Sequence, residues 1–252
     1  MFIERRTIRW FLPFALAAWA GAARAGPPYL TDDPEPPPLG HWEAVLFTTG
    51  LQAGGTATGV LPAMEFNYGG LSDTQLHVLV PLGFAAGGGE AASFGGTDVE
   101  LGVKYRFIEE DEQGWGPQVA AYPIIEVPIA SSRNGLATRS VDAFLPVWAQ
   151  KYLDGNWTID GGGGYSIDPG DRNFWVAGLL VQRKLSKALA VGVEAFHQSP
   201  GTDGEPAFTG FNVGAVYDLD EHVHLLISAG RGLQNANRSD QATWYVGYEI
   251  TE

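Results

Sequence analysis

Hydrophobic and polar side chains alternate strictly between residues 97 and 107. The apolar positions are Val99, Leu101, Val103, Tyr105 and Phe107, and charged residues or glycine lie between them. Because successive side chains of a β-strand point to opposite faces, this segment predicts a strand with one apolar and one charged face. Such a strand suits a wall with hydrocarbon on one side and water on the other.

The same alternation recurs along the chain and predicts twelve strands. They cover residues 41–51, 60–68, 74–83, 97–107, 117–128, 140–152, 157–167, 173–185, 188–198, 208–218, 222–230 and 241–251. Each has about the 9 to 11 residues that a tilted strand needs to cross a bilayer. The apolar faces carry almost no charge. Lys151 and Arg183 are exceptions near strand ends, where their side chains reach the interface.

The pattern predicts an all-β protein, a single antiparallel transmembrane barrel of about twelve strands over residues 41–252. Expected connections at one end are about 8, 13, 11, 5, 9 and 10 residues long, and those at the other about 5, 9, 4, 2 and 3. This is the loop asymmetry of outer-membrane barrels. A soluble β-sandwich is the alternative, but its outward face would normally be polar.

The first 25 residues have the form of a secretory signal peptide. Arg5, Arg6 and Arg9 precede an apolar run from Trp10 to Ala22, and Ala23-Arg24-Ala25 matches a leader-peptidase site. We expect export, cleavage before Gly26 and insertion into the outer membrane of a Gram-negative cell. Beyond this leader no apolar run reaches the roughly 18 to 20 residues of a spanning helix.

Composition supports a membrane barrel and excludes several classes of function. The chain has 29 acidic and 15 basic residues, and the leader holds four of the basic ones, so nucleic acid is not an expected partner. The absence of cysteine excludes disulfides, thiol catalysis and thiolate metal sites. No cofactor or metal site is predicted, since an acidic trio at Asp32, Asp33 and Glu35 is weak evidence for calcium.

Several segments resemble the outer-membrane proteins of the meta-pathway of phenol degradation family. They are residues 26–36, with Thr31-Asp32-Asp33-Pro34 the most specific part, Gly40-His41-Trp42-Glu43, residues 145–151, Asn156-Trp157-Thr158, Gly161–Tyr165 and Ser228–Arg231. The resemblance covers essentially the whole mature chain. It implies an outer-membrane barrel or transporter, and it transfers no catalytic or binding residue. The chain departs from barrels that end on an aromatic residue, because it ends Tyr248-Glu249-Ile250-Thr251-Glu252.

We expect a passive channel or transporter for small solutes, including hydrophobic or aromatic ones. The candidate lumen-lining residues are Glu65, Gln75, His77, Asp98, Glu100, Lys104, Arg106, Glu126, Gln150, Asp160, Glu194, Asp218 and Glu249. Acidic side chains outnumber basic ones, so cations or neutral solutes should be preferred. Alternatively, these charges pair across strands and only stiffen the barrel. Other expected partners are outer-membrane lipid, lipopolysaccharide and the barrel assembly machinery.

Two prolines lie inside predicted strands, where proline cannot donate to the ladder. If the hairpin is centred near Asn134, Pro123 lies almost opposite Pro146. This predicts a weakened wall, either ordinary bulges or a lateral opening into lipid.

Residues 26–40 contain six prolines and three acidic residues, which disfavour both strand and helix. The segment is expected to form a solvated tail, with a plug inside the lumen as the alternative.

Two other functions compete with transport. A lipid-modifying enzyme would need a Ser or Thr, a His and an orienting partner within reach. His41, His197 and His222 lie at strand ends, where interfacial positions explain them. A structural or adhesin barrel is the other alternative, because loops such as residues 84–96 are glycine-rich and show no binding motif.

Overall fold

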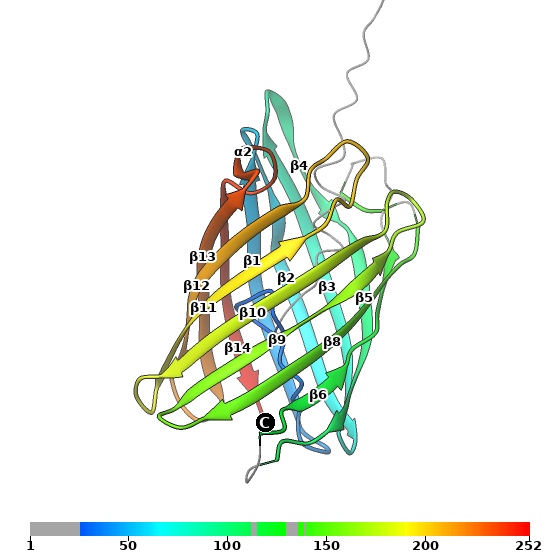
Figure 1. Ribbon diagram of the computed structural model, residues 1–252. Coiled ribbons are helices and arrows are strands. Elements are labelled where there is room, and N and C mark those ends of the chain that lie inside the picture. The colour runs from blue at the N-terminus through cyan, green and yellow to red at the C-terminus, as the bar shows by residue number, and fades with distance from the viewer. Residues whose placement is uncertain (1–25, 112–114, 130–135, 139) are drawn as a thin grey trace, which may run out of the picture.

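The computed structural model describes residues 26–111, 115–129, 136–138 and 140–252, which form one closed β-barrel (Figure 1). The predicted signal peptide, residues 1–25, lies outside the described residues. The strands are β1 (Trp42–Ala53), β2 (Thr56–Leu71), β3 (Thr74–Gly87), β4 (Glu90–Gly96), β5 (Asp98–Ile108), β6 (Gln118–Ala121), β7 (Ile124–Pro128), β8 (Asp142–Leu153), β9 (Trp157–Ile167), β10 (Phe174–Lys184), β11 (Leu189–Gln198), β12 (Phe208–Asp218), β13 (Val223–Gln234) and β14 (Ala242–Thr251).

The predicted twelve-strand barrel is confirmed. Neighbouring strands pair antiparallel, and β14 pairs with β1 to close the ring. The chain has fourteen strands rather than twelve because two strands of the wall are each divided into two segments. β4 and β5 both pair with β3, and β6 and β7 both lie between β5 and β8. We call the end where β1 begins and β14 ends the terminal end, and the opposite end the loop end.

Two of the long connections expected at the loop end are instead extended hairpins. β1 and β2 join through Gly54-Gly55, and β3 and β4 through Gly88-Gly89. All four glycines have positive φ, between 56° and 83°, which tight hairpin turns require and side chains disfavour. Residues 84–96 are therefore mostly strand rather than loop, and the β3–β4 hairpin rises above the rest of the wall (Figure 1).

The strand predicted over residues 117–128 is interrupted at Tyr122 and Pro123, but the wall does not open there. Ala121 pairs with Val147 and Ile124 with Phe144, so the register is the same on both sides of the break. The Tyr122 N–H donates to the Pro146 carbonyl, and the Pro123 carbonyl accepts from the Val103 N–H, both at 3.1 Å. Proline removes only its own donor, so the lateral opening expected at Pro123 and Pro146 is not present in the described wall.

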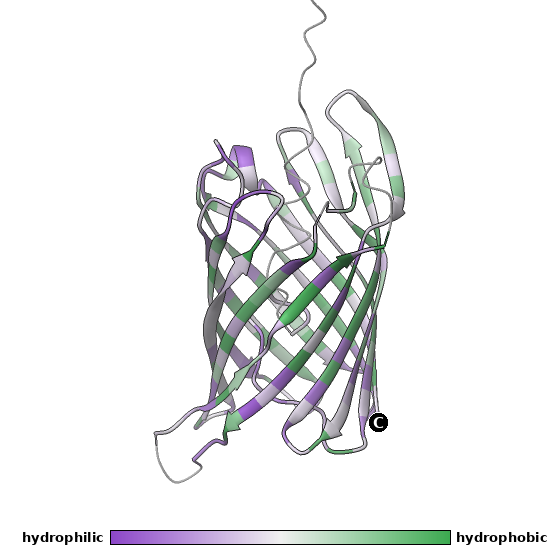
Figure 2. Ribbon diagram, turned by 90° about the vertical axis from the view of Figure 1, so that its right-hand side faces the viewer, coloured by the Kyte–Doolittle hydropathy of each residue, from purple (hydrophilic) through white to green (hydrophobic). Residues whose placement is uncertain are grey.

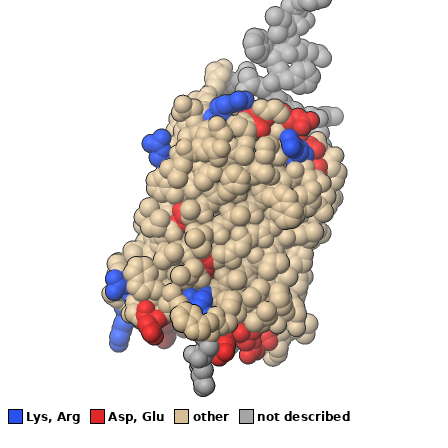
Figure 3. Space-filling model, viewed as in Figure 1, with Lys and Arg blue, Asp and Glu red and all other residues tan. Residues whose placement is uncertain are grey.

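The apolar faces of the strands point outward, as the alternation predicts. Met64 is 60% exposed and Val193 55%, although both lie in the middle of strands. Hydrophobic and hydrophilic segments alternate along the wall strands in Figure 2, and most charged side chains on the face shown in Figure 3 gather at its two ends. Arg183 lies over the Trp157 ring at 5.0 Å, and Lys151 pairs with Glu110 at 2.9 Å, which accounts for both charged exceptions.

The one helix among the described residues is α2 (Ala236–Ser239), in the connection between β13 and β14. No described helix is long and apolar enough to cross a membrane.

A charge placed on the outward face should destabilise the barrel. Val193 pairs with Val181 and Val213 near the middle of β11. We expect Val193→Arg to lower the free energy of unfolding in phospholipid vesicles by about 2 to 4 kcal/mol, the range for arginine at the bilayer midplane. Leu219→Arg, in the exposed β12–β13 turn, is the matched control and should change it by less than about 1 kcal/mol. Equal losses in urea titrations of the two variants would contradict the assignment of this face to lipid.

Candidate functional site

Residues 26–40 are called the plug: residues 26–37 lie inside the barrel, and Pro38, Leu39 and Gly40, which lead into β1, are exposed. Tyr29, Thr31, Asp32 and Pro34 are all buried, although the plug contains no helix or strand. The solvated tail that the proline content favoured is therefore wrong for these residues. Composition alone missed this placement because the contacts that hold the plug come from wall residues more than 70 positions away.

The first anchor of the plug is the carboxylate of Glu194 on β11. It accepts the Leu30 N–H at 3.1 Å, the Thr31 N–H in a shorter contact, and the Asn212 amide at 2.8 Å. Glu194 is fully buried, so these donors replace the water that the carboxylate loses. The charge on the wall thus binds the main chain of the plug.

The second anchor is Lys104, which reaches the plug from β5. Its ammonium lies 3.1 Å from Asp32 and 3.7 Å from Asp33, and 5.0 Å from the centre of the Tyr122 ring. Lys104 is only 4% exposed. Because a buried charge is tolerated when it is paired and hydrogen-bonded, Lys104 and Asp32 each depend on the other.

A third contact joins the plug to β6 and β8. Glu35 accepts from the Gln118 amide and from the Tyr152 hydroxyl, the latter at 2.9 Å. Gln118 continues into a polar chain, donating to Gln150, which donates in turn to Asp160, each at 2.6 Å. The plug is therefore tied to walls on different sides of the barrel.

Glycines on the inner face of the wall make room for the plug. Gly192 and Gly214 are paired directly across β11 and β12, and the Tyr29 ring lies over both. A Cβ added at Gly192 would lie 2.6 Å from the Tyr29 hydroxyl, and one at Gly178 would lie 2.2 Å from the Thr31 hydroxyl. Glycines at inward strand positions are a sequence signal that could have indicated a segment packed inside the barrel.

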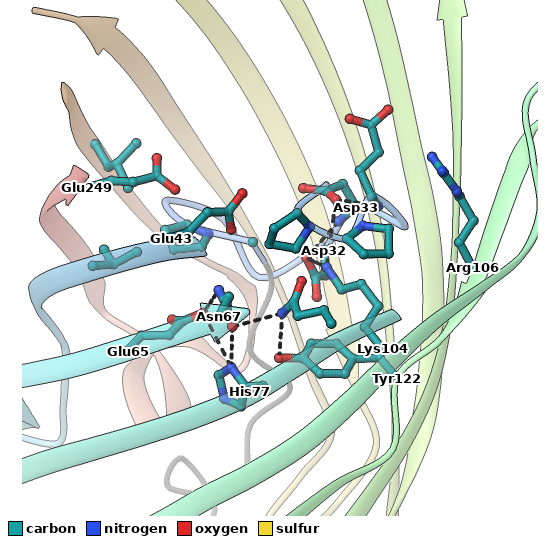
Figure 4. A pocket seen from close by; sticks show the side chains of 18 of the residues that line it. Asp32, Asp33, Glu43, Glu65, Asn67, His77, Lys104, Arg106, Tyr122 and Glu249 are labelled. Carbon is teal, nitrogen blue, oxygen red and sulfur yellow. Dashed lines mark hydrogen bonds and ion pairs between the residues drawn. The ribbon is translucent and has the colours of Figure 1, made fainter. Parts of the chain in front are cut away.

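A cavity of about 550 Å³ lies between the plug and the wall, toward the terminal end (Figure 4). Its carboxylates are Asp32, Asp33, Glu35, Glu43, Glu65 and Glu249, and its cations are Lys104 and Arg106. Asn67 organises one side, since it donates to Glu65 at 2.9 Å and its oxygen lies 2.8 Å from His77 Nδ1. The cavity is therefore polar, with an excess of negative charge.

Apolar side chains fill much of the interior from the edge of the cavity toward the loop end. One cluster contains Tyr122, Ile124, Phe144, Trp148, Phe174 and Val176, and a second contains Val45, Phe47, Val60, Ala63, Leu79, Leu226 and Tyr245. The expectation of a polar inner face is thus too simple. On β8, for example, the inward Phe144, Pro146 and Trp148 are apolar and lie between the inward polar residues Asp142 and Gln150.

All thirteen candidate lumen residues point into the barrel, but they form separate groups. Glu65, Gln75, His77, Lys104, Arg106 and Glu249 line the cavity. Asp98, Glu100 and Glu126 lie toward the loop end, where Asp98 accepts the Thr138 N–H. Gln150 and Asp160 belong to the polar chain, Glu194 anchors the plug, and Asp218 contacts His224 at 2.8 Å.

Sequence reasoning missed Glu43, Asn212 and Tyr29. Glu43 precedes inward Val45 by two residues, so the alternation of β1 already placed it in the lumen. Asn212 lies on the same face of β12 as the inward Asp218, so the alternation places it in the lumen, but no local pattern shows its contact with Glu194. Tyr29 carried no signal of its own, because its burial depends on the paired glycines of distant strands.

No group of three or more described His, Asp or Glu side chains is arranged to hold a metal ion. The acidic trio of the plug is engaged by Lys104, Gln118 and Tyr152 instead.

This geometry, a closed barrel with an apolar exterior and a plugged, partly acidic lumen, is that of a transmembrane β-barrel. The COG4313 outer membrane channel from Pseudomonas putida F1 is similar in structure, with a TM-score of 0.71 and 16% identity over 87% of this chain and 98% of that one. The NanC porin matches with a TM-score of 0.56 and 10% identity, over 82% and 98% of the two chains. The KdgM porin, solved with oligogalacturonate, has a TM-score of 0.55 and 9% identity over the same shares.

The sequence of residues 47–250 matches the family described as "Putative MetA-pathway of phenol degradation". The chain belongs to this family. A search of curated proteins found no match to its sequence.

Removing the first anchor should release the plug. In Glu194→Ala, the Leu30 and Thr31 N–H groups lose their acceptor, and each buried unsatisfied donor costs about 1 to 3 kcal/mol. We expect amide hydrogen exchange of residues 26–40 to accelerate at least about 30-fold, which corresponds to about 2 kcal/mol. Asp218→Ala is the matched control, since it removes a lumen carboxylate that contacts His224 rather than the plug. Unchanged exchange in Glu194→Ala would show that Glu194 does not hold the plug.

Proposed function

We propose that the protein is a passive outer-membrane channel for small solutes. The observation that carries this proposal is the polar cavity of about 550 Å³ inside a barrel whose outer surface is apolar. A wall of this kind separates lipid from water, and a cavity of this size can hold a small molecule. The channel fold of the structural relatives and the family assignment support the same conclusion.

The charges of the cavity favour cations and neutral solutes. Six carboxylates line it, against Lys104 and Arg106, and Lys104 is already paired with the plug. The apolar clusters toward the loop end would favour solutes that also carry an apolar part, because such a solute exchanges water for hydrocarbon contacts there. The description of the family, which refers to phenol degradation, agrees with aromatic solutes.

This function implies partners that the barrel surface would meet. Outer-membrane lipid and lipopolysaccharide would cover the apolar wall, and the barrel assembly machinery would insert the exported chain. Removal of residues 1–25 at the predicted leader-peptidase site would free Gly26 as the first residue of the plug.

An enzyme on the barrel is the competing proposal, and one contact bears on it. His224 lies 2.8 Å from Asp218 and 3.4 Å from the Thr251 hydroxyl. The order Thr–His–Asp is that of a nucleophile, base and orienting group, but the Thr251 distance exceeds the roughly 2.6 to 3.2 Å of an activated hydroxyl. His197 lies 2.8 Å from the Thr209 hydroxyl, but that hydroxyl donates its proton to Gln234, so His197 is not placed to accept it. The remaining described histidines contact Asn67, Glu221 or the Glu252 carbonyl. The geometry therefore favours a channel.

Ion selectivity tests the proposal. In planar bilayers under a potassium chloride gradient, we expect a reversal potential of the sign that reports cation preference. The triple variant Glu43→Gln, Glu65→Gln, Glu249→Gln should shift this potential toward zero, because it removes three of the cavity's carboxylates. Asp203→Asn, Glu205→Gln, Glu221→Gln removes the same charge from exposed connections and should shift it much less.

Conductance provides the second measurement. Glu194→Ala, with its plug released, should conduct more current than the unmodified barrel. A barrel that conducts no ions even in this variant, or one with a strong anion preference, would contradict the proposed function.

A further inference from the structure

The hollow that holds Tyr29 has the shape and chemistry of a binding site. Gly192 and Gly214 remove two side chains from adjacent strands at the same height, and the Tyr29 ring fills the space. A Cβ at Gly214 would lie 2.8 Å from Tyr29 Cε1, and one at Gly192 would also meet Gln182 at 2.9 Å. The hollow is thus a feature of the rigid wall, while its occupant belongs to the irregular plug.

The surroundings of the hollow match an aromatic ring. Leu180 on β10 and Leu30 of the plug pack against Tyr29, which is 6% exposed. Burial, with the nearby Glu194 charge, raises the pKa of the Tyr29 hydroxyl, so the group held there is a neutral phenol. A free phenol has the same ring and hydroxyl as this side chain, without the main chain that links Tyr29 to the plug.

A solute in the cavity reaches the edge of this hollow. Val216, the next inward residue after Gly214 on β12, lines the cavity together with its cross-strand partner Leu226. Pro27, two residues before Tyr29, lines it as well. Only a short movement of the plug therefore separates the cavity from the space beneath the Tyr29 ring.

The plug is held in a way that permits exchange. It adds no strand to the wall, and side chains of the wall hold it at Glu194, Lys104, Gln118, Tyr152 and Ser228. A ligand that occupies the hollow excludes Tyr29 from it. Ligand binding therefore favours the state in which the plug has moved, and the seated plug weakens ligand binding to the same extent.

We propose that the Gly192–Gly214 hollow binds small aromatic compounds such as phenol, which compete with Tyr29 and so loosen the plug. The inference rests on the proposed channel function, since it names the class of solute that opens the lumen. It also gives the plug a role, because the seated plug narrows an empty lumen and a solute of this class widens it by releasing the plug.

Phenol binding by the purified full chain in detergent, measured by isothermal titration calorimetry, tests the proposal without requiring conduction. Tyr29→Ala removes the competitor and should tighten phenol binding by about tenfold if Tyr29 occupies the hollow nine-tenths of the time. Gly192→Leu and Gly214→Leu each fill the hollow and should abolish binding. Gly161→Leu is the matched control, since a Cβ at this position meets only Gly178 and Leu179 at 3.4 Å, and it should bind like the unmodified chain.

Cyclohexanol, of similar size but without the aromatic ring, should bind at least tenfold more weakly than phenol. Equal affinity for the two alcohols, no tightening in Tyr29→Ala, or unchanged phenol binding in both leucine variants would each overturn the proposal. The heat-modifiable gel mobility of folded barrels shows that each variant has folded, and two leucine positions guard against the failure of one. A barrel that binds phenol as expected but carries no ions would contradict the channel and leave the binding site standing.

Discussion

The need to pair every backbone N–H and C=O group within hydrocarbon governs this structure. No water is available there to satisfy a free group, so a sheet must close on itself. The closure between β1 and β14 meets this requirement, and so does the break at Tyr122 and Pro123, where hydrogen bonds to Pro146 and Val103 continue on both sides. A proline in the wall is tolerated because its carbonyl still accepts and its neighbour still donates.

Closure has a second consequence, because it encloses side chains that must find partners in a confined interior. Lys104 and Glu194 are almost fully buried, and each would be costly alone. Both partners come from the plug: carboxylates for Lys104 and main-chain N–H groups for Glu194. The plug is thus the electrostatic complement of two wall residues that face the lumen from different sides.

The wall could be predicted from the sequence, whereas most of the lumen could not. Which face of a strand points outward follows from the strand's own alternation. The residues from Val99 to Phe107 therefore predicted the orientation of their strand without reference to any other segment. The hairpin ends were missed because Gly54-Gly55 and Gly88-Gly89 were taken as loop composition rather than as turn residues. The position of the plug depends on contacts between residues 26–40 and strands far along the chain. Such contacts leave no local pattern, and only the inward glycines pointed to them.

The prolines of the plug explain how it can be ordered without becoming part of the wall. They restrict the unfolded segment, so ordering it costs less conformational entropy and a few anchors suffice. They also lack N–H donors, so the segment cannot extend the ladder as a further strand. Wall closure and plug binding are therefore separate equilibria. Apart from the bond between the Gly40 N–H and the Gly69 carbonyl, where the plug joins β1, the described wall strands pair with one another and not with the plug. This is the physical condition for a lumen that opens without unfolding.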